Sequence, residues 1–284
     1  AVFSVRPKPT VIYTAHGLHF YGGAPIKNWL LWFPVEWILA RFTNLIVVIN
    51  HWDLWAVRSL LKARDVQLIP GMGVDLARFT PPNHEERNTS RAQLGIQSSD
   101  IVLIYVAEFI PRKNHPFIIE AMPALIAANK NIRLLFVGRG PLLEQMRNKV
   151  GQLAIHDRVD FLGFRRDVEG LMHAADIAVS ASRHEGLPIG IAEAMACGLP
   201  VVATQDRGHA ELVDDGRNGW LFPQNDKDNF VSRILTLSFN PALRSDFGRH
   251  SEKRVRAFSQ KASIDALSAI YASLSNPQEK GNHQ

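Results

Sequence analysis

Short apolar runs recur along most of the chain, and amphipathic stretches separate them. Runs of this kind are typical of parallel strands that are buried on both faces, and their alternation with helices predicts an α/β fold with parallel sheets. The predicted strands are 10–14, 45–49, 66–69, 101–106, 133–137, 159–162, 177–180 and 201–203. The predicted helices are 34–42, 116–129, 142–153, 167–174, 188–197, 226–237 and 260–274.

The 284 residues suffice for one large domain or two of ordinary size. Residues 81–90 are polar and begin with two prolines, which predicts a linker, and residues 81–258 carry the alternation of one complete domain. Residues 1–80 hold too few elements for a doubly wound domain of comparable size, so we expect an incomplete N-terminal domain in a fragment or processed chain. Residues 2–9 predict a connector into the first strand, and residues 259–284 a last helix with a disordered tail.

The composition is that of a globular protein, with 46% hydrophobic and 21% charged residues, and excludes a collagen-like or largely disordered chain. The single cysteine, Cys197, excludes a disulfide framework and a cysteine-based zinc site. We expect it to be a small buried residue at a helix end. The net charge of +5 suits phosphorylated ligands or an anionic membrane. Because the basic residues are dispersed, we do not expect nucleic acid as a partner.

Residues 29–49 are mostly apolar, but a proline and charged residues interrupt them, so no uncharged run is long enough to span a bilayer. The sequence leaves two interpretations open. The favoured one is a core helix followed by a buried strand, because buried helices carry the same aromatic residues. The other is a helix whose aromatic residues between Trp29 and Trp37, with Lys27 nearby, lie in a bilayer interface.

The segment 182–200 combines a glycine-containing loop with a helix N-terminus. Pro188 suits the first helical turn, and the free N–H groups beside Gly186 form an anion site that a diphosphate fits. Glu185 precedes the helix and Glu193 lies about 7 Å along its axis, so a carboxylate on each side of this site can accept hydrogen bonds from sugar hydroxyl groups. By spacing alone, a helix-capping Glu185 and a solvated Glu193 fit the sequence equally well.

The glutamates stand in the setting EGLPxxxxEAMACGLPVVA, which resembles the signature of the family 4 retaining glycosyltransferases with the GT-B fold. Further segments that resemble this family are 137–141, 158–163, 175–177 and 216–222. Residues 13–21 and 207–211 resemble bacterial members that build capsular and exopolysaccharide repeat units. The resemblance covers nearly the whole chain and implies two Rossmann-like doubly wound domains, of which the N-terminal one is incomplete.

The resemblance also implies a role for each matching residue. Glu185 would contact hydroxyl groups of the transferred sugar, and Glu193 would hold the ribose of the nucleotide. The N–H groups of three residues at the helix start would face the phosphates, a glycine would form the strand-end turn, and backbone groups would bind the base. These further donor-binding residues are Gly186, Leu187, Ile189, Gly138, Val159 and Phe161.

Lys113 matches the phosphate-binding lysine of the family. Its chemistry is needed because departure of a nucleoside diphosphate builds negative charge that a fixed cation stabilises. The family commonly has an arginine five residues earlier, where this chain has Glu108; Arg112 or Arg139 are the candidates to replace it. His16 matches a histidine that faces the donor from the N-terminal domain, and it follows a predicted strand, where α/β sites form.

The resemblance implies transfer of a sugar, with retention of configuration, from a nucleotide-sugar, expected to be a UDP-sugar, to a growing lipid-linked surface polysaccharide. We expect a cytoplasmic protein at the inner face of the membrane. We expect no metal, because helix N–H groups and Lys113 would replace one, and the pair Asp226 and Asp228 is better explained as a helix cap. The alternatives are an inactive nucleotide-sugar-binding module, because half of the N-terminal domain would be missing, and another GT-B enzyme such as a nucleotide-sugar epimerase.

Overall fold

The computed structural model describes residues 9–275. The chain divides into two compact units, Ala1–Gly73 together with Phe258–Gln284, and Val74–Ala257. This division falls somewhat before the boundary expected at residue 81, and the last helix belongs to the same unit as the N-terminal segment. The connector predicted at residues 2–9 and the predicted disordered tail lie almost wholly outside the described residues.

The larger unit is built on a sheet of six parallel strands. They are β4 (Ile101–Val106), β5 (Ile132–Val137), β6 (Val159–Phe161), β7 (Ile177–Ser180), β8 (Val201–Thr204) and β9 (Gly219–Phe222). Across the sheet the order is β6-β5-β4-β7-β8-β9, so the chain adds strands outward from β4 and then outward from β7 in the other direction. The two central strands pair at Leu103 and Ile177. Their carboxyl ends form a topological switch point, where open α/β sheets bind ligands.

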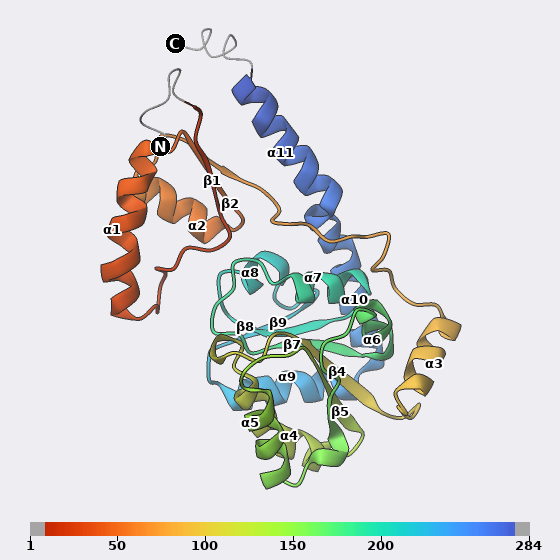
Figure 1. The fold of residues 1–284 in the computed structure, drawn as a ribbon. Helices are drawn as coiled ribbons and strands as arrows, with labels where there is room; N and C mark the ends of the chain where they lie inside the picture. Colours follow the sequence, from red (N-terminus) through yellow and green to blue (C-terminus); the bar gives the residue numbers. More distant parts are fainter. Residues whose placement is uncertain (1–8, 276–284) are drawn as a thin grey trace. The chain divides into compact units, whose positions relative to one another are not determined.

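Helices cover both faces of this sheet (Figure 1). One face carries α4 (His115–Ala128), α5 (Leu143–Gln152) and α9 (Lys227–Phe239), and the other carries α6 (Val168–Ala174), α7 (Ile189–Ala196) and α8 (His209–Leu212). Two more helices, α3 (His84–Gln93) and α10 (Pro241–Val255), pack on α6 and α7 respectively. Phe136 of β5 and Phe230 of α9 are completely buried in the core between sheet and helices. The predicted doubly wound α/β architecture is confirmed for this unit.

The smaller unit has a parallel sheet in the order β1 (Ile12–Ala15), β2 (Leu45–Val48) and β3 (Val66–Leu68). Its helices are α1 (Ile26–Phe42), α2 (His51–Ala56), which continues into a π-helical turn (Val57–Leu61), and α11 (Gln260–Ser275). The central strand β2 is buried along its whole length, as its unbroken apolar sequence predicts. Each predicted strand is present in the structure. The sequence analysis does not predict β9 or α10.

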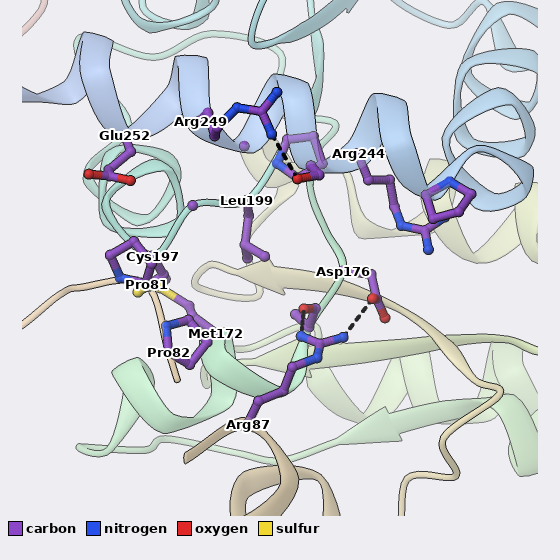
Figure 2. Close-up of a pocket in the computed structure, with 16 residues that line it drawn as sticks. Pro81, Pro82, Arg87, Met172, Asp176, Cys197, Leu199, Arg244, Arg249 and Glu252 are labelled. Carbon is purple, nitrogen blue, oxygen red and sulfur yellow. Dashed lines mark hydrogen bonds and ion pairs between the residues drawn. The ribbon is translucent and has the colours of Figure 1, made fainter. Parts of the chain in front are cut away.

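The predicted linker at residues 81–90 is wrong, because most of it forms α3. Asn83 accepts a hydrogen bond from the N–H of Glu86 at 2.9 Å, and the Glu86 carboxylate accepts one from the N–H of Asn83 at 2.8 Å. This capping box starts the helix. Arg87 then donates to Asp176 at 2.7 Å, as Figure 2 shows, and the buried Arg91 donates to the same carboxylate at 3.3 Å. The polar residues of this segment therefore bind the domain.

The core interpretation is wrong for most of the predicted helix 34–42, whereas the buried strand predicted after it is confirmed as β2. α1 begins at Ile26 and continues through Pro34, which removes one backbone hydrogen bond without ending the helix. Of its residues, all of which the structure describes, only Glu36 and Ala40 are buried. The exposed apolar side chains are Ile26, Leu30, Leu31, Trp32, Val35, Trp37, Ile38, Leu39 and Phe42. No helix among residues 9–275 combines the length and apolar character needed to cross a bilayer.

Candidate functional site

Two loops meet at the switch point of the larger sheet. The loop after β4 contains a single 3-10 turn (Pro111–Lys113), and the loop after β7 carries Glu185. A backbone hydrogen bond of 2.9 Å from Arg183 to Arg112 joins the two loops. The topology therefore brings Lys113 and Glu185 together although they lie 72 residues apart in the sequence.

Two cations hold the Glu185 carboxylate. Lys113 Nζ donates to Oε1, and Arg112 Nη1 donates to Oε2 at 2.9 Å. The side chains of Glu185 and Lys113 are only 8% and 16% exposed, so their ion pair is shielded from water, whereas Arg112 is 36% exposed. Burial alone would raise the pKa of Glu185, but the charge of Lys113 and hydrogen bonds from Lys113 and Ser182 outweigh it and hold the pKa below its ordinary value. Glu185 is therefore ionised, and its single negative charge is paired with the positive charges of two side chains.

The start of α7 lies directly after Glu185. Pro188 is its N-cap, so the N–H groups of Ile189 and Gly190 have no partner within the helix, whereas that of Ile191 donates to the Pro188 carbonyl oxygen at 3.1 Å. Gly186, Leu187 and Ile189, the predicted phosphate-binding residues, all lie at this end, and α7 has no acidic residue in its first turn. Favourable interaction with an anion follows from these N–H groups and the helix dipole.

Glu193 lies further along α7 and is largely buried. Burial raises the pKa of its carboxyl to about 7, Arg78 opposes this rise, and Glu169 adds to it. Arg78 itself donates to Glu169 at 3.1 Å through Nε. In the sequence, the start of α7 therefore lies between Glu185 and Glu193. The carboxyl group of Glu193 has a pKa close to neutral pH.

Glycines allow the backbones of this edge to approach closely. Gly138 follows β5 with φ +145°, and a Cβ there would lie 2.0 Å from the carbonyl oxygen of Ala107. Gly208 packs on the backbone of Glu185, where an added Cβ would lie 2.7 Å from the Glu185 Cβ. Both positions exclude any larger residue, so the strand-end turn and the Glu185 loop depend on glycine.

A cavity of about 400 Å³ lies at the carboxyl ends of β4 and β5. Its lining residues are Val106, Ala107, Glu108, Val137, Gly138, Arg139, Phe164, Arg165 and Val168. The guanidinium of Arg139 lies 5.2 Å from the centre of the Phe164 ring. The cavity thus offers an aromatic ring and a guanidinium group next to the carboxylate of Glu108. A planar base can stack on such a surface.

Val159 and Phe161, the predicted base-binding residues, do not line this cavity. Val159 pairs with Leu134 inside the sheet, and the ring of Phe161 packs 5.4 Å from that of Phe136 in the core. The residues at the cavity are Phe164 and Arg165, a few positions later. A loop that directly follows a short strand is the signal that indicates them, since α/β sites form beyond strand ends.

The remaining predicted residues are placed as follows. His16 lies in the smaller unit, exposed, directly after β1. Asp226 caps α9 by accepting a hydrogen bond from the N–H of Asn229 at 3.0 Å, which confirms the capping interpretation. Cys197 is buried at the end of α7, as predicted. The sequence analysis missed the buried polar residues behind Glu185: Tyr105, Ser180, Ser182, Thr204, Asp206 and His209.

A second cavity of about 400 Å³, drawn in Figure 2, lies at the opposite edge of the sheet, because Asp176 and Pro200 precede β7 and β8. Arg87 there is engaged by Asp176. Arg244 donates to the carbonyl oxygens of Leu237 and Ser238 at the end of α9. These guanidinium groups fasten helices to the domain.

The chain matches known glycosyltransferases. Residues 86–254 match the family model described as Glycosyl transferases group 1. The chain is 35% identical to EpsD of Bacillus subtilis (strain 168), which is named as a glycosyltransferase, over 95% of this chain and 71% of EpsD. It is 25% identical to the Escherichia coli UDP-Gal:alpha-D-GlcNAc-diphosphoundecaprenol alpha-1,3-galactosyltransferase, over 94% of this chain and 70% of that protein. The chain therefore belongs to the group 1 glycosyltransferase family.

Solved structures show the same fold. HepE from Anabaena, in complex with UDP and glucose, has a TM-score of 0.82 at 22% identity and covers 93% of this chain and 72% of its own. WaaG, a glycosyltransferase involved in lipopolysaccharide biosynthesis, has a TM-score of 0.77 at 19% identity, over 91% of this chain and 74% of its own. The predicted glycosyltransferase resemblance and the predicted GT-B fold class are both confirmed.

Proposed function

We propose that this protein is a retaining family 4 glycosyltransferase that transfers a sugar from a UDP-sugar to a lipid-linked glycan in bacterial polysaccharide biosynthesis, at the cytoplasmic face of the membrane. The observation that carries the proposal is the buried Glu185 carboxylate, held by Lys113 and Arg112 beside the start of α7. This site supplies a hydrogen-bond acceptor for a sugar, and cations with helix N–H groups for a diphosphate.

The charges suit departure of a nucleoside diphosphate. Two cations, Lys113 and Arg112, face the single carboxylate of Glu185, which leaves one positive charge in excess. As the bond to the sugar breaks, negative charge grows on the phosphate, and Lys113 with the N–H groups of α7 stabilises it. The same phosphate oxygen can accept the proton of the acceptor hydroxyl on the face that it leaves, which retains the configuration. No metal ion is required in this scheme.

The donor and acceptor classes follow from relatives. HepE is described in complex with UDP and glucose, and the Escherichia coli relative is named for a UDP-galactose donor and a diphosphoundecaprenol-linked acceptor. The cavity lined by Arg139 and Phe164 can stack a planar base. These points support UDP and a lipid-linked glycan for this chain.

Calorimetric titration with UDP, GDP and ADP tests the donor site. We expect UDP to bind most tightly, without added metal, and Glu193→Ala to weaken it about tenfold or more through loss of charge-assisted hydrogen bonds. Glu144→Ala is the matched control, because this side chain is 80% exposed on α5. Failure of all three nucleotides to bind, or equal effects of the two substitutions, would contradict the proposal.

Product analysis tests the reaction itself. We expect the new glycosidic bond to keep the anomeric configuration of the donor, as read from its NMR coupling constant. An inverted product would exclude the retaining mechanism. Donor binding without any transfer to acceptor would favour the alternative of a nucleotide-sugar-binding module, and donor epimerisation would favour the epimerase.

We further propose that α1 contacts the surface of an anionic bilayer, the acceptor's location. The helix exposes Trp32, Trp37 and its other apolar residues, while its single carboxylate, Glu36, is buried against Tyr13. Lys27 and Arg41 stand at its two ends. The exposed surface is therefore apolar and positively charged, which complements anionic headgroups over an apolar layer.

Co-sedimentation with vesicles tests this contact. We expect binding to phosphatidylglycerol vesicles that declines with added salt, and much weaker binding to phosphatidylcholine vesicles. The pair Trp32→Ser and Leu31→Ser should weaken binding, whereas Trp55→Ser, which removes an exposed tryptophan of α2, should not. Equal binding by the α1 variant and the α2 variant would overturn the assignment to α1.

A further inference from the structure

A row of hydrogen bonds lies behind Glu185 in the core of the larger unit. Nδ1 of His209 lies 3.1 Å from Oδ1 of Asp206, and Nε2 of His209 lies 2.9 Å from Oγ of Ser180. The three side chains are buried: Ser180 is 2% exposed, His209 is fully buried, and the Asp206 side chain is 5% exposed. The row connects the end of β7 to the loop after β8.

The proton positions in this row follow from the acceptors. Oδ1 of Asp206 can only accept, and it also receives the N–H of His209 at 2.7 Å. Nδ1 of His209 must therefore carry a proton, and in the neutral form of the ring Nε2 then accepts the hydroxyl proton of Ser180. The imidazole is thereby fixed in one tautomer and one orientation.

This row is joined directly to the Glu185 loop. Gly208, next to His209, touches the Glu185 backbone, and Arg207 Nε donates to the Glu185 carbonyl oxygen at 3.3 Å. The position of the Glu185 backbone therefore depends on the loop that Asp206 and His209 hold.

A second set of buried hydrogen bonds fixes the residues just before Glu185. Thr204 Oγ1 donates to the Ser182 carbonyl oxygen at 2.5 Å, and the Ser182 hydroxyl lies 2.9 Å from the hydroxyl of Tyr105. Tyr105 in turn donates to the carbonyl oxygen of Lys113 at 2.7 Å. The loops of Glu185 and Lys113 are thus connected from behind.

The Ser180, His209 and Asp206 side chains have the order of a hydrolase triad, but their burial excludes that chemistry. The Ser180 hydroxyl is inaccessible to a substrate and already accepts the N–H of Ser182 at 3.4 Å. A nucleophile must reach its substrate, so this arrangement holds structure in place.

We propose that His209, fixed between Asp206 and Ser180, is a positioning residue that sets the Glu185 carboxylate against the transferred sugar. This inference rests on the proposed role of Glu185 as the residue that contacts the sugar. Lys113 and Arg112 pair with the Glu185 carboxylate through flexible side chains. The hydrogen bonds of His209 hold the loop that packs against the Glu185 backbone and so fix the backbone position of Glu185. Loss of the row affects recognition of the sugar and leaves recognition of the nucleotide unchanged.

Paired titrations with UDP and UDP-glucose separate these two parts of the donor. For His209→Gln we expect unchanged UDP affinity and about tenfold weaker UDP-glucose binding, which corresponds to about 1.4 kcal/mol. His209→Asn should restore most of the loss, because its amide can donate to Asp206 from the place of Nδ1. His156→Gln, at a histidine side chain that is 72% exposed, is the control. Equal losses for both ligands, or no rescue by asparagine, would overturn the proposal.

A spectroscopic measurement tests the row without any ligand. Long-range ¹H–¹⁵N NMR should show His209 as the Nδ1–H tautomer, assigned by its absence in His209→Gln. Asp206→Asn should change that tautomer balance, even if His209→Gln proves poorly folded. An Nε2–H tautomer in the unsubstituted protein would overturn the proposal. If the unsubstituted protein binds neither UDP nor UDP-glucose, the proposed function fails, and the sugar-positioning role of His209 fails with it.

Discussion

Replacement of Glu193 by glutamine is expected to stabilise the protein at alkaline pH and to leave its stability unchanged in acid. Burial raises the pKa of this carboxyl from 4.5 to about 7, with Arg78 opposing the rise and Glu169 adding to it. A carboxyl group in such a site resists ionisation. Glutamine has a similar shape and cannot ionise, so it removes the cost of a buried charge.

The sign and size of the effect follow from proton linkage. Between pH 4.5 and pH 7 the unfolded chain releases the Glu193 proton while the folded chain retains it, so the free energy of unfolding falls as the pH rises. At about 1.4 kcal/mol for each pH unit, the full loss is about 3 kcal/mol and is reached above pH 7. The glutamine variant escapes this loss.

Urea unfolding at pH 5 and pH 8, followed by circular dichroism, measures the effect. The difference in unfolding free energy between Glu193→Gln and the unsubstituted protein should grow by a few kcal/mol from the lower to the higher pH. All other groups are common to both proteins and cancel. Glu144→Gln, at an 80% exposed side chain, is the control and should change little. A difference that is the same at both pH values would refute the reasoning, and UDP binding should weaken in the stabilised variant.

Three further predictions test the structure. Asp176→Ala should cost about 3–5 kcal/mol, because it leaves the buried Arg91 without its carboxylate, whereas Asp167→Ala removes an exposed ion pair and should cost less than about 1 kcal/mol; equal urea midpoints would contradict this. Asn83→Ala should lower stability by about 1 kcal/mol through loss of the α3 cap, and an unchanged melting temperature would show that the cap is unimportant. Gly208→Ala should abolish UDP-glucose binding in calorimetry, because its Cβ would lie 2.7 Å from a Glu185 atom; unaltered binding would mean that the loop moves freely.

The fold class was predictable because the signal is local. Strands buried on both faces require continuous apolar residues, and this pattern can be read without knowing their neighbours. The same method failed at β9, Gly219–Phe222, which is only four residues long and begins with a glycine. It failed at α3 because polar composition is ambiguous: arginines that bind buried carboxylates look the same in sequence as arginines in solvent.

Exposure was the least predictable property. The aromatic residues of α1 are as apolar as those of a core helix, and only the structure shows that Trp29 and Phe33 face the core while Trp32 and Trp37 do not. The surroundings of the predicted base-side residues were equally hidden in the sequence. Val159 and Phe161 satisfy a motif, but strand pairing and core packing occupy them, and the cavity is lined by residues just beyond the strand end.

The sequence by itself determined the α/β class, the helix that begins after Glu185, and the spacing of Glu185 and Glu193, because helix geometry relates residues a few positions apart. The tertiary structure alone decided that Lys113 meets Glu185, and that His209 lies behind it. Those contacts join residues far apart in the chain, and they exist because the strand order reverses between β4 and β7 and brings their following loops to one edge of the sheet.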